Sequence, residues 1–230
     1  MTFHDLRWTR RELPATLVKL ALAGLLIAVF PLALPVANEP ARAELLATVY
    51  STGAIIALLL FAPLHGASLR NTFGWCAAVT SLLLIFVFLD PATRASAKLT
   101  PALALIVFLL GATLGILARR LPPAIVIGLF ALLALVPMWA GPMLELANNP
   151  VWANRLVMYV SPLTALATAL DFDYLRTAWF YEYSAVATMR YDYPNFVNII
   201  LLLAVLPVAA VIRRYSTKDS AFQYSSEAHP

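Results

Sequence analysis

The chain has 230 residues, of which 62% are hydrophobic and only 12% are charged, and its formal net charge is +4. A soluble domain is about 45–50% apolar and about 25% charged, so this composition would leave large apolar patches in water. It therefore excludes an ordinary soluble domain and predicts an integral membrane protein. The length allows roughly five to seven spans of about 20 residues each.

Six apolar segments, each bounded by proline, glycine or charged residues, follow one another along the chain. They cover residues 15–37, 45–64, 74–89, 99–118, 124–143 and 196–212, and the third extends back to about Leu69 if the residues before it are helical. Backbone polar groups cannot be hydrated in lipid, so each segment is predicted to be an α-helix. The predicted fold class is all-α, a polytopic membrane protein with six transmembrane helices. Lys19 lies one turn from the entrance of the first span, where its ammonium group can reach the lipid head groups.

Basic residues are distributed unevenly between the two sets of connections. Ten of the 16 Lys and Arg residues lie on the side of the N-terminus, and the acidic residues favour the other side. By the positive-inside rule, both termini are predicted to be cytoplasmic. The membrane is expected to be a bacterial inner membrane. The net positive charge then reflects membrane topology and not nucleic-acid binding.

Residues 144–195 form a long connection between the fifth and sixth apolar segments, and connections of this length are uncommon and usually functional. Its first part, 149–170, is too apolar for a hydrated loop, but Pro162 prevents a smooth helix through its middle. We therefore expect two short helices that meet at Ser161 and Pro162 and dip into the outer leaflet. A seventh span is the competing interpretation, and it would place the C-terminus outside.

The second part of this connection is rich in tyrosine and tryptophan, which prefer the membrane interface. It predicts an aromatic belt that anchors a surface helix, or else an exit-side contact for a substrate or an extracytoplasmic protein. The predicted outer acidic and aromatic rim comprises Asp171, Asp173, Trp179, Tyr181 and Glu182. The polar residues 214–230 lack periodicity and predict a disordered tail.

The region after the fifth apolar segment resembles the ABC-2 type family of ABC transporter permeases. The resemblance is carried by a P-x-W element, spaced apolar residues and an S-P-L-T element, namely Pro150, Trp152, Leu156, Tyr159, Ser161, Pro162, Leu163 and Thr164. It implies a re-entrant outer hairpin between helices five and six. The apolar segments fit this family, with residues 15–143 as helices one to five, 144–195 as the extracytoplasmic segment and 196–213 as helix six, and residues 1–14 resemble its cytoplasmic elbow.

The resemblance further implies that the chain binds no cofactor directly. ATP and Mg²⁺ would be bound by a separate ABC ATPase subunit, and a second copy of the permease or a homologue would complete the transporter. The ATPase-coupling loop would lie at 63–72 and include His65, Ser68, Arg70 and Asn71. This loop lacks the acidic residue and the R-x-x-G-T-like turn of the family, which indicates a weakened or specialised ATPase contact.

Other classes of function have less support in the sequence. The chain has no G-x-x-x-x-G-K-[ST] and no G-x-S-x-G motif, and its single cysteine, Cys76, excludes an internal disulfide and a cysteine-cluster metal site. The absence of converging polar residues argues against an enzyme. A non-transporting anchor or assembly subunit of an envelope complex is the main alternative, followed by a secondary transporter or channel. Small residues that would allow close helix contacts are Gly24, Gly53, Gly128 and Ala131.

Overall fold

The computed structural model describes residues 12–29, 42–61, 69–94, 100–148, 150–173 and 192–227, and all regular secondary structure within these ranges is helical. The predicted all-α class is confirmed. The helices are α1 (Glu12–Val29), α2 (Arg42–Phe61), α3 (Leu69–Leu89), α4 (Pro91–Arg94), α5 (Thr100–Leu117), α6 (Pro123–Ala134), α7 (Val136–Leu146), α8 (Val151–Val160), α9 (Pro162–Ala169) and α11 (Phe196–Glu227).

Two helices of the described chain are long and apolar enough to cross a membrane, namely Leu69–Leu89 and the Phe196–Arg214 part of α11. The bent pair Pro123–Ala134 and Val136–Leu144 makes a third if it counts as one span. Shorter apolar helices cover Ala15–Val29, Leu46–Leu60 and Pro101–Leu117. By length and composition, the helices suit a membrane protein with two clear spans, fewer than the six predicted.

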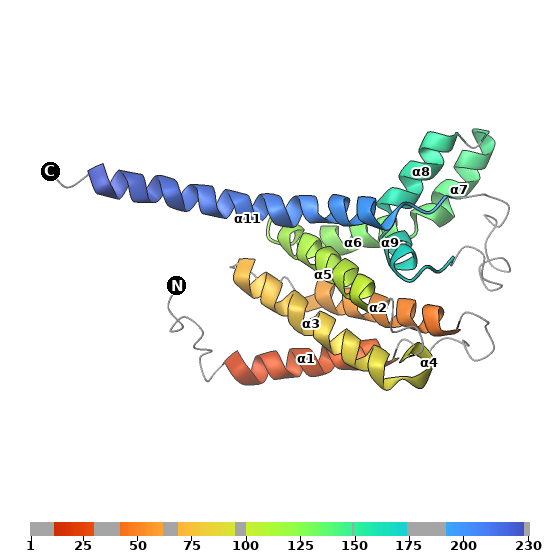
Figure 1. Cartoon of the computed structure of the whole chain (residues 1–230), viewed down its shortest axis with the longest axis horizontal. Helices are drawn as coiled ribbons and strands as arrows, with labels where there is room; N and C mark the ends of the chain where they lie inside the picture. The colour runs from red at the N-terminus through yellow and green to blue at the C-terminus, as the bar shows by residue number, and fades with distance from the viewer. Residues whose placement is uncertain are drawn as a thin grey trace.

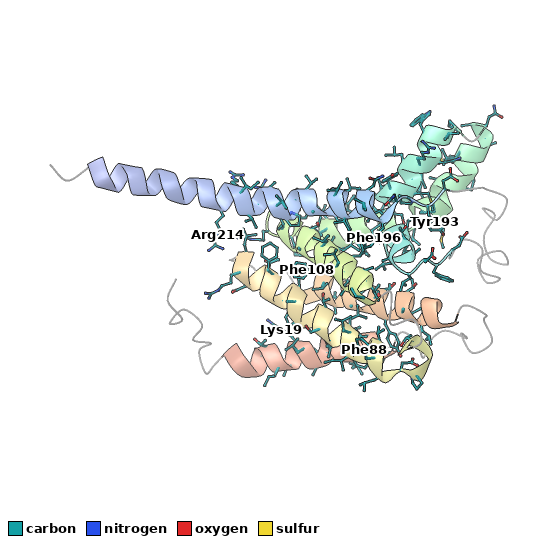
Figure 2. The ribbon with its side chains drawn as sticks, in the orientation of Figure 1. Lys19, Phe88, Phe108, Tyr193, Phe196 and Arg214 are labelled. Carbon is teal, nitrogen blue, oxygen red and sulfur yellow. The ribbon has the colours of Figure 1, made fainter. Side chains whose placement is uncertain are left out.

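The long helices form a bundle in which successive members run in opposite directions (Figure 1). Helices α1, α2 and α3 all contact one another, α5 packs on α2 and α3, and α11 lies along α5. The start of α1 and the end of α11 point to the same end of the bundle, whereas α4, α7 and α8 lie at the opposite end. Figure 2 places Lys19 and Arg214 toward the first end and Tyr193 toward the second.

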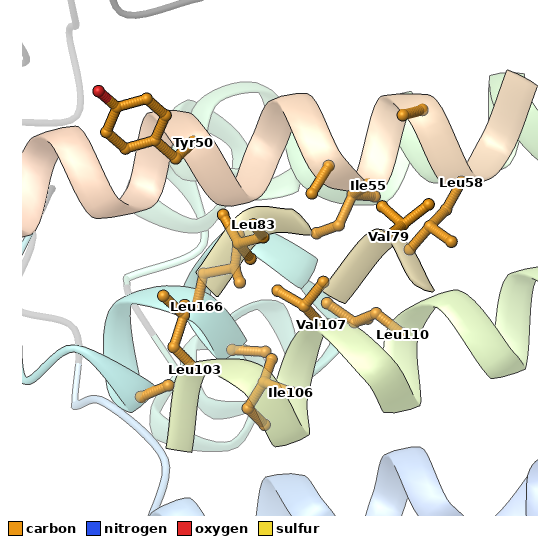
Figure 3. Close-up of a cluster of buried hydrophobic side chains, with 14 of the residues drawn as sticks. Tyr50, Ile55, Leu58, Val79, Leu83, Leu103, Ile106, Val107, Leu110 and Leu166 are labelled. Atoms are coloured by element: carbon orange, nitrogen blue, oxygen red, sulfur yellow. The ribbon is translucent and has the colours of Figure 1, made fainter. Parts of the chain in front are cut away.

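The main core lies where α2, α3, α5 and α9 meet (Figure 3). Its fully buried side chains include Leu58, Leu83, Ile106 and Leu166. Leu166 comes from the predicted re-entrant segment and has no exposed surface, so α9 is part of the bundle interior and not a surface loop. A smaller cluster that includes Val157 joins α8 to α7.

The backbones of α1 and α2 approach each other closely at Gly53. A Cβ atom at this glycine would lie 3.1 Å from the Cα atom of Ile27 and 3.2 Å from the carbonyl oxygen of Leu26. The predicted role of Gly53 in close packing is therefore confirmed. At Gly24 the nearest atom would be at an ordinary 3.5 Å, and Gly128 faces open space.

A polar contact joins α2 to the end of α3. The Tyr50 hydroxyl donates a hydrogen bond to Oδ2 of Asp90 at 2.9 Å, and the Tyr50 ring stacks on Phe86. Thr93 on α4 donates to the carbonyl of Val87 at 2.6 Å. The Thr93 bond satisfies a carbonyl in the last turn of α3, where helical carbonyls lack intrahelical partners.

The prediction of one continuous helix over 124–143 was wrong. Helix α6 ends at Ala134, α7 starts at Val136, and the two are bent by 51°. The physical cause is Pro137, which lacks the N–H that the carbonyl of Leu133 would accept and whose ring crowds that carbonyl. The sequence contains this proline, but its effect on the span was not predicted.

The C-terminal segment also differs from expectation. Helix α11 continues to Glu227, so residues 214–227 are helical and not a disordered tail. No proline or glycine lies between Arg213 and Glu227, so nothing in this stretch stops a helix that starts in the apolar segment.

Candidate functional site

The two short helices α8 and α9 meet at Ser161, as predicted, and lie between the fifth and sixth apolar segments. Ser161 has extended backbone angles and caps α9, because its Oγ accepts a hydrogen bond from the backbone N–H of Thr164 at 3.4 Å. Pro162 then occupies the first helical position, where its missing N–H has no cost. The break between α8 and α9 is therefore built from a serine cap followed by proline.

Ser161 also connects this break to the break between α6 and α7. Its hydroxyl donates a hydrogen bond to the carbonyl oxygen of Ala134 at 3.3 Å, and the residue is only 1% exposed. In a continuous helix this carbonyl would accept from Met138, but the N–H of Met138 donates to Leu135 instead, at 2.9 Å. One buried hydroxyl thus satisfies backbone groups of two interrupted helices.

Next to this junction lies a cavity of about 240 Å³. It is lined by α5 and α6, by α11, and by the α8–α9 junction. Its lining on α5 runs from Leu110 to Leu117 and on α6 from Val126 to Leu133, in both cases at positions i, i+3, i+4 and i+7. This spacing is one face of each helix over two turns, so the cavity is elongated along the helix axes.

Pro207 leaves a backbone carbonyl in the cavity wall without its helical hydrogen bond, and a side chain from another helix donates to that carbonyl. Pro207 within α11 cannot donate to the carbonyl of Leu203, four residues earlier. The hydroxyl of Thr113 on α5 donates to that carbonyl at 3.1 Å. Both Thr113 and Leu203 line the cavity. The hydrogen bond ties α5 to α11 at the point where the helical ladder of α11 is interrupted.

The residues of the predicted outer segment have different positions. Tyr159, Ser161 and Pro162 line the cavity, and Thr164 is fully buried behind them, with Oγ1 3.9 Å from the Met158 sulfur. Pro150 is the N-cap of α8. Trp152 is 72% exposed and does not contribute to the cavity.

The hydroxyl of Tyr159 accepts a hydrogen bond at 3.0 Å from Nδ2 of Asn198, in the first turn of α11. Asn198 is exposed, so this pair marks the boundary between the cavity and the outside of the bundle. Thr113 and Asn198 were not predicted as site residues. In the sequence, each is visible only as a polar residue within an apolar segment. That observation does not predict a site residue until its hydrogen-bond partner on another helix is known.

The predicted acidic and aromatic rim is described only in part. Asp173 accepts a hydrogen bond from the hydroxyl of Tyr193 at 2.8 Å. Asp171 is exposed and has a φ of 50°. Trp179, Tyr181 and Glu182 lie outside the described residues.

Asp171 ends α9 as the left-handed residue of a Schellman motif. The N–H of Phe172 donates to the carbonyl of Ala167 at 2.9 Å, and the N–H of Asp171 donates to that of Thr168 at 3.4 Å. Glycine is the usual residue at this position, because other L-residues have a steric cost in the left-handed region.

We therefore expect Asp171→Gly to raise the free energy of unfolding by about 0.5–1 kcal/mol. The measurement is unfolding of the purified protein in mixed micelles by titration with sodium dodecyl sulfate. Asp173→Gly is the matched control, and it should lower stability because it removes the acceptor of Tyr193. A loss of stability in Asp171→Gly would show that its carboxylate contributes more than the backbone strain costs.

Two residues of the predicted ATPase-coupling loop belong to a helix. Arg70 and Asn71 lie in the first turn of α3, which starts at Leu69, and both are exposed. The predicted extension of the third apolar segment back to Leu69 is confirmed, so Arg70 and Asn71 belong to a helical turn and not to the loop. His65 and Ser68 lie outside the described residues. Across the described ranges, no group of three His, Cys, Asp or Glu residues is placed to hold a metal ion.

Comparisons with known proteins do not identify the chain. The site is a junction of two interrupted helices beside an elongated apolar cavity, with a tyrosine–asparagine pair at its boundary. No protein-family model matches the chain, and neither the curated proteins nor the solved structures give a significant match.

Proposed function

We propose that the chain is the transmembrane permease subunit of an ABC-2 type ABC transporter, with six spans and both termini in the cytoplasm of a bacterium. The observation that carries the proposal is the α8–α9 pair. It lies between the fifth and sixth apolar segments, is interrupted at Ser161 and Pro162, and contributes the fully buried Leu166 to the core. A re-entrant hairpin at this position is the feature for which the sequence resembles the family.

Helix lengths and directions support six spans. The apolar parts of α1, α2 and α5 have 15 to 17 residues, about 22–26 Å along the axis, and the residues at the helix ends extend these helices to 18–20 residues, close to the thickness of the hydrocarbon core. Helices α1, α2, α3, α5, α6 and α11 alternate in direction through the bundle (Figure 1). With the bent α6–α7 pair as the fifth span, this order agrees with the six apolar segments.

The charge distribution supports cytoplasmic termini. Helix α3 starts with Arg70 at the end of the bundle where α1 starts, and Arg119 and Arg120 follow α5 at the same end. Arg214 on α11 lies toward that end as well, and Arg213 precedes it in the sequence. Basic residues near helix ends favour the cytoplasmic side.

In this proposal a separate ATPase dimer binds ATP and Mg²⁺ and acts on the end of the bundle that carries Arg70. Two permease subunits, either two copies of this chain or this chain and a homologue, would complete the pathway. The chain itself would contribute no catalytic residue.

Isolation from native membranes tests the proposal. We expect an affinity-tagged chain to co-purify with an ABC ATPase, and the complex in proteoliposomes to hydrolyse ATP faster than the ATPase alone. Co-purification without stimulation would favour the alternative, a non-transporting anchor subunit. If no ATPase co-purifies, the permease proposal is wrong.

The Arg70→Glu variant addresses coupling. Because it reverses a charge on the first turn of α3, we expect it to reduce ATPase stimulation while the chain still folds and inserts. Arg70→Lys keeps the charge and is the matched control. Equal stimulation by Arg70→Glu and the unmodified chain would remove Arg70 from the ATPase contact.

A further inference from the structure

The cavity beside the α8–α9 junction is apolar and elongated, and it opens to the outside of the bundle, because its lining includes the exposed side chains of Leu129 and Leu202. The lining residues from Leu110 to Leu117 correspond to a rise of about 10 Å along α5. An apolar cavity of about 150 Å³ accepts a molecule the size of benzene, whereas pockets for drug-sized ligands have about 300–1,000 Å³. A cavity of about 240 Å³ with this shape therefore fits a single slender apolar chain better than a bulky ring system.

Away from Tyr159, the hydroxyl groups of the cavity wall already donate hydrogen bonds within the protein. Thr113 donates to the carbonyl of Leu203, and Ser161 donates to the carbonyl of Ala134. A polar ligand deep in the cavity would lose its hydration without gaining these donors, which is costly. An apolar chain has no such cost, so the interior of the cavity favours a hydrocarbon chain over a polar ligand.

One end of the cavity has a different character. The Tyr159 hydroxyl accepts a hydrogen bond from Asn198, so its own proton is still available for donation to a third group. Arg155 is exposed on α8 four residues before Tyr159, and residues at this spacing are neighbours on one helix face. A guanidinium on the same helix face as this phenol would add a positive charge near this end of the cavity, and the two groups together would suit an anionic group.

We propose that this cavity binds the acyl chain of an anionic lipid, whose head group lies against Arg155 and Tyr159 while the chain extends between α5, α6 and α11. The apolar interior accounts for the chain, and the basic and phenolic boundary accounts for the charge of the head group. The proposal goes beyond the proposed function and does not require that the chain transports anything, because a bound lipid would also suit an anchor subunit.

Photo-crosslinking tests the proposal directly. The purified protein is reconstituted in phosphatidylcholine vesicles that contain a trace of phosphatidylglycerol with a diazirine in one acyl chain. After irradiation, labelled peptides are mapped by mass spectrometry. We expect saturable labelling of residues 110–117 and 126–133, and we expect unlabelled phosphatidylglycerol to reduce it more strongly than additional phosphatidylcholine does.

Two substitutions on α11 separate the cavity from the outer surface. Leu203→Trp fills the cavity and should abolish the labelling, whereas Leu206→Trp, at an exposed position that does not line the cavity, should leave it unchanged. Thermal unfolding of both variants controls for folding. If Leu203→Trp does not fold, Ala165→Leu places added side-chain volume at another lining position and serves the same purpose.

Arg155→Gln tests the head group. It should raise about tenfold the concentration of unlabelled phosphatidylglycerol that halves the labelling, because this is the loss of affinity expected for one charged hydrogen bond. Unlabelled palmitate is used as a second competitor in the same labelling experiment. If it competes as well as phosphatidylglycerol, a carboxylate head group is sufficient, and if it does not, the site requires the phospholipid. Either result keeps the acyl chain and the anionic group.

Three outcomes would overturn the proposal. Even labelling of the exposed faces of α1 and α11 would indicate contact with bulk lipid only. Labelling that persists in a folded Leu203→Trp variant would exclude the cavity as the site. Equal competition by phosphatidylcholine and phosphatidylglycerol, with no effect of Arg155→Gln, would remove the anionic head group from the proposal.

Discussion

Replacing Gly53 by leucine is expected to lower the free energy of unfolding by about 3 kcal/mol or more. A Cβ atom at this position would lie 3.1 Å from the Cα atom of Ile27 and 3.2 Å from the Leu26 carbonyl oxygen. These are backbone atoms of α1, which cannot move aside as the end of a flexible side chain can. The two helices would have to separate, and the van der Waals contacts that hold helices together in lipid would be lost.

Titration with sodium dodecyl sulfate in mixed micelles, followed by circular dichroism, measures this effect. Gly74→Leu is the matched control, because nothing lies within 4 Å of a Cβ atom at that exposed position on α3. We expect the control to change stability by no more than about 0.5 kcal/mol, or to raise it slightly through helix propensity. Similar stability of the two variants would mean that α1 and α2 are not in backbone contact at Gly53.

The second large effect is expected for Ser161→Ala, which should cost about 2–4 kcal/mol. The substitution removes the acceptor for the Thr164 N–H and the donor for the Ala134 carbonyl. Both groups lie at a buried junction, where no water replaces the lost partner. The variant should therefore destabilise both the α8–α9 junction and the α6–α7 junction.

Thr168→Ala is the matched control for Ser161→Ala. Thr168 donates to the carbonyl of Thr164, one turn earlier in the same helix, so its removal should cost far less. Ser161→Thr keeps the hydroxyl and should restore most of the lost stability. We would abandon the proposed junction if Ser161→Ala unfolded at the same detergent concentration as Thr168→Ala.

Parts of the site were predictable because they depend on local chemistry. The break at Ser161 and Pro162 follows from a serine cap and a proline at the first helical position, and both are readable from neighbouring residues. The break at Leu135 has an equally local cause in Pro137, yet one proline in an apolar segment does not reveal whether the helix bends or continues. Pro207 shows the difference, because α11 continues through it.

Other parts were not predictable because they depend on partners distant in the sequence. Thr113 contacts Leu203 and Ser161 contacts Ala134, which are 90 and 27 residues away, respectively. No hydrophobic periodicity and no sequence motif predicts either contact. Asp171 was assigned to an acidic rim from its charge, but the structure shows that its backbone conformation ends α9.

The sequence by itself determined that the chain is helical and apolar, and that an interrupted segment precedes the last long helix, because composition and hydrophobic runs follow directly from residue identity. Only the tertiary structure decided which helices contact each other, where prolines leave carbonyls to be satisfied by other helices, and where a cavity is left between them. The physical reason is that nearly every face of these helices is apolar. Hydrophobicity then does not distinguish the face that meets lipid from the face that meets protein, and close packing and a few buried hydrogen bonds make that choice.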